Sequence, residues 1–207
     1  MRAQVLIIFS AAAVICGFCR AEPADAVPVR ITVRVYTVVE VPGFVLRTAQ
    51  ANAASILRRS GVQLTWVDCT QALAPLREEA CAGPLPSNGL TLRILPDPAR
   101  NFAPNAMGVA FVGPTAAVNA SIYYRRVTTY AEIESISVPQ ALGPVIAHEI
   151  VHLLRGDSHH ARSGLMRAQW DKNDVQLARV GLLLLTREDR QRMGVRLASR
   201  LESVRTP

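Results

Sequence analysis

Apolar and polar residues first alternate along the chain between positions 29 and 36, where every second residue from Val29 to Val35 is apolar. This period of two is typical of a strand with one buried face. A helical period follows over residues 44–60, and Gly61 stands where a left-handed C-terminal cap is expected. Alternation returns over residues 62–66. The pattern predicts a β-helix-β unit at the start of the domain.

Three short runs rich in apolar residues come next, at 90–95, 107–112 and 121–124, with Gly113 and Pro114 between the last two. Short runs bounded by such turn residues are typical of strands. We therefore expect about five strands in total.

Two helical patterns occupy the second half of the chain. The first runs from about residue 139 to 155, and Pro144 should either lie in its first turn or kink it, since proline has no N–H to donate. The second begins behind Thr186 as N-cap, with Asp189 three residues on. Its core-facing residues at helical spacing are Met193, Leu197 and Leu201. The chain is thus predicted to be an α+β protein.

The N-terminus has the organisation of an export signal. Arg2 precedes an apolar run from Val5 to Phe18, and an Ala-x-Ala pattern ends at Ala26. The run is 14 residues long, short of the about 20 that span a bilayer, so a permanent anchor is the weaker interpretation. We expect residues 1–26 to be a cleaved signal peptide and residues 27–207 to form a single domain, secreted or periplasmic.

Removal of the signal peptide would leave two cysteines, Cys69 and Cys81. An even number of cysteines in an exported chain is typical of disulfide bonding. The alternative, a metal site, needs further cysteine or histidine ligands at zinc spacing, and the sequence has none nearby. We therefore predict one disulfide between Cys69 and Cys81.

The formal net charge is +7, and Lys172 is the only lysine among the 23 basic residues. This arginine and alanine enrichment is typical of GC-rich codon usage, and the sequence shows no basic patch interleaved with aromatic residues. We therefore expect no nucleic-acid partner. No stretch after the signal segment is long enough to span a membrane, so no membrane association is expected after signal cleavage. The oligomeric state stays open.

The helical pattern predicted over about 139–155 carries an H-E-x-x-H motif at His148, Glu149 and His152. Its spacing of four residues places both imidazoles on one helix face, where they can bind one metal ion, and Glu149 lies beside them. The chain has only four histidines, so a chance match of this kind is rare. A purely structural helix is the weaker interpretation.

A third ligand is expected because a catalytic zinc takes three protein ligands and leaves a fourth position open. Gly156 can end the helix, and two adjacent histidines follow in the turn, His159 and His160. A Gly-Leu-Met segment comes shortly after, at residues 164–166. Together these segments resemble the metzincin clan of zinc peptidases, with its elongated H-E-x-x-H-x-x-G-x-x-H motif and methionine turn.

The motif departs from the clan pattern at one point, because Gly156 lies four residues after His152 rather than three. His159 keeps the G-x-x-H spacing. His160 corresponds to the histidine of a group of small bacterial proteins of unknown function that the chain also resembles, in which Arg-Ala-Gln-Trp follows the methionine turn, as at residues 167–170 here. On this resemblance His160 is the favoured third ligand and His159 the alternative.

The resemblance implies a zincin/metzincin-like fold: a mixed sheet of about five strands packed on a long helix and the zinc helix, with a C-terminal helix. It implies one catalytic Zn²⁺ and hydrolysis of peptide or protein substrates, with Glu149 as general base. It also implies that Met166 is a hydrophobic floor beneath the metal rather than an ordinary core residue, and that an edge strand at 106–112 or 121–124 holds the substrate. Two other classes stay open, a secreted zinc-binding module without turnover and a secreted scaffold without metal.

Overall fold

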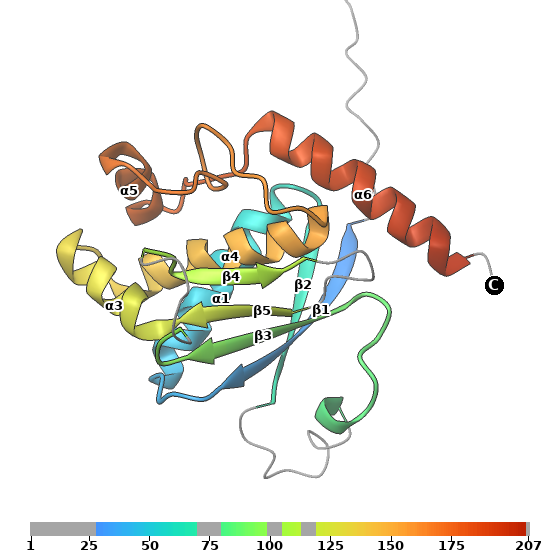
Figure 1. Cartoon of the computed structure of the whole chain (residues 1–207), viewed down its shortest axis with the longest axis horizontal. Helices are drawn as coiled ribbons and strands as arrows, with labels where there is room; N and C mark the ends of the chain where they lie inside the picture. Colours follow the sequence, from blue (N-terminus) through green and yellow to red (C-terminus); the bar gives the residue numbers. More distant parts are fainter. Residues whose placement is uncertain (1–27, 70–79, 99–104, 113–118, 206–207) are drawn as a thin grey trace, which may run out of the picture.

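The computed structural model describes residues 28–69, 80–98, 105–112 and 119–205 (Figure 1). The predicted signal peptide, residues 1–26, lies outside these ranges. Within them the chain forms a mixed sheet with helices packed against it, as Figure 1 shows.

Five strands form the sheet: β1 (Val29–Thr37), β2 (Val62–Asp68), β3 (Gly89–Leu95), β4 (Gly108–Phe111) and β5 (Asn119–Tyr123). Their order is β2-β1-β3-β5-β4. Neighbouring strands run parallel except β4, which is antiparallel to β5. Within the described residues, β2 and β4 are therefore the edge strands, and β5 is paired on both sides.

The alternation in β1 predicted its buried face correctly. Three of the four residues of this face are at most 2% exposed, Ile31, Val33 and Val35, and Val29 at the start of the strand is half-buried. On the opposite face Arg34 is also buried, because its guanidinium donates hydrogen bonds to the carbonyl oxygens of Gly83 and Pro84 at 2.7 and 3.0 Å. The segment before β3 therefore covers this part of the sheet.

The main helices are α1 (Gly43–Arg58), α3 (Tyr124–Ile133), α4 (Val138–Arg155), α5 (Lys172–Arg179) and α6 (Arg187–Arg205). α1 and α4 pack against each other and against the sheet (Figure 1). They approach closely at Gly143, where an added Cβ would lie 2.6 Å from the Asn52 Cβ. α1 ends at Arg58, and Gly61 takes its left-handed φ of 78° in the turn beyond rather than at the cap itself.

α4 has clear start and stop signals. The Ser137 N–H donates to the Gln140 side-chain oxygen at 2.9 Å, which stabilises the first turn. Pro144 lies inside the helix rather than in its first turn. Gly156 ends the helix with a left-handed φ of 69° and donates its N–H to the His152 carbonyl.

Two helices were not predicted. α3 begins at Tyr124, which the apolar pattern placed in a strand, and β5 ends one residue earlier. α3 buries Val127 and Ala131, which are four residues apart and face the core. α5 starts behind Asp171, whose carboxylate accepts the N–H groups of the first turn.

α6 begins where the sequence predicted. The Asp189 N–H donates to Thr186 Oγ1 at 3.1 Å, and the Thr186 hydroxyl donates to the Asp189 carboxylate at 2.6 Å. Met193 and Leu197 are buried as predicted, whereas the Leu201 side chain lies outside the described part. Among the described helices, none has the length and apolar content that a membrane span requires.

The predicted disulfide is present between Cys69 and Cys81. Cys69 follows β2, and its N–H donates to the Val35 carbonyl. The Cys81 carbonyl accepts the hydroxyl of Tyr36 at 3.3 Å. Both ends of the disulfide are thus attached to β1.

Candidate metal and catalytic site

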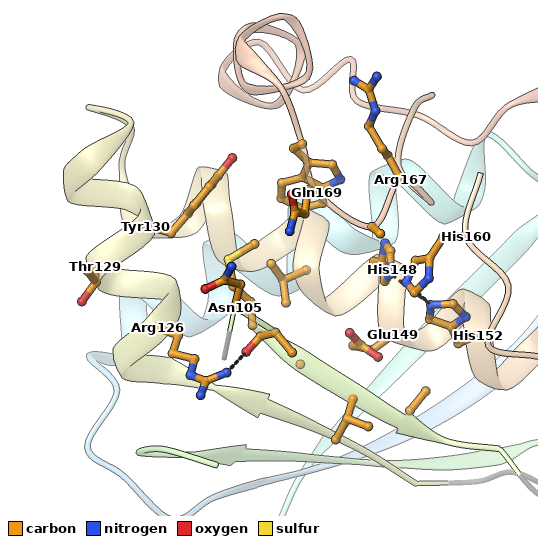
Figure 2. Close-up of a pocket in the computed structure, with 18 of the residues that line it drawn as sticks. Asn105, Arg126, Thr129, Tyr130, His148, Glu149, His152, His160, Arg167 and Gln169 are labelled. Atoms are coloured by element: carbon orange, nitrogen blue, oxygen red, sulfur yellow. Dashed lines mark hydrogen bonds between the residues drawn. The ribbon is translucent and has the colours of Figure 1, made fainter. Parts of the chain in front are cut away.

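The H-E-x-x-H helix places its motif residues in one cleft. His148, Glu149 and His152 lie in the second half of α4 and are at most 8% exposed. The two histidines share a helix face, with ring centroids 4.7 Å apart. His160 comes from the loop after Gly156, and its ring centroid lies 4.8 Å from that of His152. Helix and loop therefore converge on one point (Figure 2).

The ring nitrogens of these histidines face one another. Nε2 of His152 lies 3.0 Å from Nε2 of His148 and 3.3 Å from Nε2 of His160. Ligand-capable nitrogens of all three rings lie within 4.8 Å of one another. Two nitrogens bound to one tetrahedral zinc at 2.0–2.1 Å would be about 3.4 Å apart. Both separations from His152 Nε2 are close to this value, and three imidazoles suit zinc in chemistry.

Main-chain carbonyls orient two of the rings. The Nδ1–H of His148 donates to the Leu165 carbonyl at 2.8 Å, and that of His152 donates to the Asp157 carbonyl at 2.9 Å. With Nδ1 protonated, each neutral ring presents a lone pair at Nε2. Two lone pairs 3.0 Å apart repel each other unless a shared cation lies between them. The hydrogen bonds therefore favour a metal ion at this position.

Burial favours the neutral form of the two helix imidazoles, His148 and His152, whereas His160 is an exposed residue. Desolvation is the main cause that lowers the pKa of His148 to about 3 and the pKa of His152 to about 4. The pKa of His160 is lowered too, first by desolvation and then by the neighbouring His159. Neutral imidazole is the form that binds zinc, so at neutral pH a metal ion would not have to displace protons from these rings.

His159, the alternative third ligand, does not join the cluster. Its side chain is exposed, and its backbone N–H donates to the Asp157 carboxylate at 3.0 Å. Among the described residues, the group that could hold a metal consists of His148, His152 and His160. The structure brings together the favoured set, and metal binding by it stays a prediction.

The predicted methionine turn contacts the cluster through its main chain. Gly164 takes a φ of 74°, and a Cβ there would lie 2.8 Å from the Leu184 carbonyl oxygen, so the turn requires glycine. The Leu165 carbonyl accepts both His148 Nδ1–H and Trp170 Nε1–H, the latter at 3.1 Å. Met166 is fully buried in the core. Its role as a floor beneath a metal stays a prediction.

Glu149 faces the cleft from α4 (Figure 2). Its side chain is buried, and desolvation raises the pKa of Glu149 to about 8. Gly108 of β4 lies directly against it, since an added Cβ would be 2.8 Å from Glu149 Oε1. The carboxyl group therefore sits in the narrow space between α4 and the edge strand.

A cleft of about 840 Å³ opens beside the cluster and runs along β4 and α3. Tyr130 of α3 and Trp170 form part of its wall, with their rings edge to face at 6.2 Å. Desolvation raises the pKa of Tyr130 to about 12. The sequence patterns did not predict this wall, although Val127 and Ala131 have the i,i+4 spacing that is typical of a helix.

Comparisons with known proteins support the fold. No known protein family and no curated protein sequence matches the chain. Its structure is similar to the crystal structure of a zinc-dependent peptidase from Methanocorpusculum labreanum (strain Z), with a TM-score of 0.54 and 14% sequence identity. The match covers 78% of this chain and 99% of that one. At this identity the likeness shows the fold, and the predicted zincin-like α+β architecture is confirmed.

Proposed function

We propose that the chain is a secreted zinc-dependent endopeptidase in which His148, His152 and His160 hold a single zinc ion. The observation that carries the proposal is the convergence of three imidazoles from one helix and the loop behind it. The fold shared with a zinc-dependent peptidase supports the peptidase class. Zinc in such a site supplies Lewis-acid chemistry, since it lowers the pKa of water and polarises a carbonyl group.

Glu149 is the proposed general base. It is adjacent in sequence to His148, faces the cleft, and is held by burial against Gly108. Its raised pKa makes the ionised carboxylate a strong proton acceptor, and a nearby positive charge would favour that ionised form. It would take the proton of the attacking water and deliver it to the leaving amine.

β4 is the proposed substrate-binding strand, in preference to residues 121–124. β5 pairs with β3 on one side and β4 on the other, so its main-chain groups are already used. β4 is the edge strand of the described sheet, and Gly108 places it against Glu149. An extended peptide added to β4 by main-chain hydrogen bonds would pass along the cleft beside the base.

An exported location is part of the proposal. The disulfide between Cys69 and Cys81 supports it, because such bonds persist in oxidising compartments. The proposed substrates are therefore peptides or proteins in the periplasm or outside the cell.

The metal content of purified residues 27–207 tests the zinc site. We expect one equivalent of zinc in the wild type and in His159→Ala, and loss of zinc in His148→Ala and His160→Ala. The exposed His159 is the matched control, because it is the neighbour of His160. A folded wild type that binds no zinc would contradict the proposal.

Cleavage of a fluorogenic casein by Glu149→Gln tests the reaction. The amide keeps the shape of the side chain but cannot accept a proton, so we expect full zinc content and a rate at least about 100-fold lower. Undiminished cleavage by this variant would rule out Glu149 as the base. Zinc binding with no cleavage by the wild type would favour a secreted zinc-binding module.

A further inference from the structure

Arg155, the last residue of α4, has a fully buried guanidinium between the metal-site loop and α6. Its side chain is 0% exposed. A buried arginine is unfavourable unless its charge is paired and its N–H groups are used. The proposed reaction does not use Arg155, so its partners indicate what it holds in place.

On one side Arg155 binds the side chain of Asp157. Its Nε donates to Asp157 Oδ2 at 3.3 Å, and its Nη2 lies 2.9 Å from Oδ1 as an ion pair without hydrogen-bond geometry. The Asp157 carbonyl accepts the Nδ1–H of His152, and its carboxylate accepts the N–H of His159. Asp157 thus sets both the orientation of one imidazole and the path of the loop to His160.

On the other side Arg155 binds the start of α6. Its Nη1 donates to Asp189 Oδ1 at 3.0 Å, and the Asp189 side chain is 4% exposed. The second carboxylate oxygen of Asp189 accepts the N–H and the hydroxyl of Thr186. The guanidinium therefore joins the capped end of α6 to the loop that carries His160.

A second contact links the same two elements. Gly156, at the start of the loop, lies against the Arg196 guanidinium, since an added Cβ would be 3.1 Å from Arg196 Nε. α6 and α4 pack against each other in this region. The loop is thus held from its first residue by side chains that belong to, or bind to, α6.

We propose that Arg155 and Asp189 are positioning residues of the metal site, through which α6 orders the His160 loop and strengthens zinc binding. The inference rests on the proposed zinc site. Partners that orient metal ligands typically change metal affinity 10–100-fold when removed. Ordering the loop before the metal arrives also lowers the entropy that binding must overcome.

Zinc affinity in Asp189→Asn and Asp157→Ala tests the inference. We expect the zinc dissociation constant, measured by competition with a chromogenic chelator, to rise about 10–100-fold in each variant. Glu188→Ala is the matched control, because Glu188 is 71% exposed and pairs with Arg192 on the surface of α6. It should bind zinc like the wild type.

The absorption spectrum of bound Co²⁺ separates positioning from a loss of stability. A displaced imidazole changes the coordination and hence the visible bands, whereas a less stable protein with an intact site keeps them. Should Asp189→Asn fail to fold, Asp157→Ala still tests whether the Arg155 contact with the loop strengthens zinc binding, because the Asp157 side chain is 39% exposed and its loss is easier to tolerate. Wild-type zinc affinity and Co²⁺ spectra in the folded variants would overturn the inference. A wild type without zinc affinity would instead overturn the zinc site, and this inference with it.

Discussion

Individual side chains in the cleft are held by groups that the motif itself does not contain. The carbonyls of Leu165 and Asp157 set the tautomers of two histidines. Gly108 leaves room for Glu149, because the carboxyl group occupies the space that a Cβ would fill. The chemistry of the H-E-x-x-H residues thus depends on partners outside the helix.

Gly108→Ala should destabilise the protein through Glu149. The added Cβ would lie 2.8 Å from both Cγ and Oε1 of Glu149, so the carboxyl group or the strand must move. We expect a loss of about 1–3 kcal/mol in the free energy of unfolding, measured with urea in the presence of a chelator.

The same substitution in a Glu149→Ala background is the control. The atoms that clash are then missing, so most of the loss should disappear, and the double-mutant cycle should show coupling of more than about 1 kcal/mol. An equal loss in both backgrounds would mean that Gly108 is needed for the strand and not for the carboxyl group.

Between elements, the contact of α4 with α1 determines where the candidate metal ligands on α4 lie. Gly143 and Pro144 both stand inside α4, where they are unfavourable for an isolated helix. The packing explains the glycine, because a Cβ there would lie 2.6 Å from Asn52 Cβ and 3.0 Å from the Ala49 carbonyl oxygen. The close contact between the two helices therefore requires glycine at position 143, although glycine lowers helix propensity there.

Gly143→Ala should destabilise the fold although alanine is the better helix former. Overpacking against α1 should outweigh the gain in propensity and leave a net loss of about 1–2 kcal/mol in urea unfolding. Gly194→Ala in α6 is the matched control, because nothing lies within 4 Å of its added Cβ. It should stabilise the protein by up to about 1 kcal/mol, and a similar gain at position 143 would contradict the packing argument.

Across the whole molecule, the disulfide and the candidate metal site lie near opposite edges of the described sheet. Cys69 follows β2, one edge strand, whereas the cleft borders β4, the other edge strand of the described sheet. Removal of the disulfide is therefore expected to lower the stability of the fold without changing zinc affinity at the candidate site.

Replacing both Cys69 and Cys81 with serine should lower the free energy of unfolding by about 3 kcal/mol. The two cysteines are 12 residues apart in sequence, and closing a loop of that size restricts the unfolded chain by about this amount. Urea unfolding measures the loss, while zinc affinity of the folded variant should stay within about twofold of the wild type. A large fall in zinc affinity would show that the two edges are coupled.

Local periodicity was sufficient to predict the strands, the three helical patterns that became α1, α4 and α6, and the shared helix face of His148 and His152. His148 and His152 lie on one face because residues four apart do so in any α-helix, whatever surrounds it. The Thr186 cap and the buried face of β1 are equally local, and both were predicted from the residues alone. A resemblance of short motifs, rather than periodicity, favoured His160 over His159.

The remaining features are decided by contacts between residues that are distant in sequence, and only the tertiary structure shows them. Strand order leaves no period in a sequence, so the edge position of β4 and its approach to Glu149 appeared only in the folded chain. Tyr124 continues an apolar run, yet it begins α3, because the helix can bury Val127 and Ala131 there. The place of His160 depends on Arg155, and its partner Asp189 is 34 residues away in sequence and meets it only when α6 packs on α4.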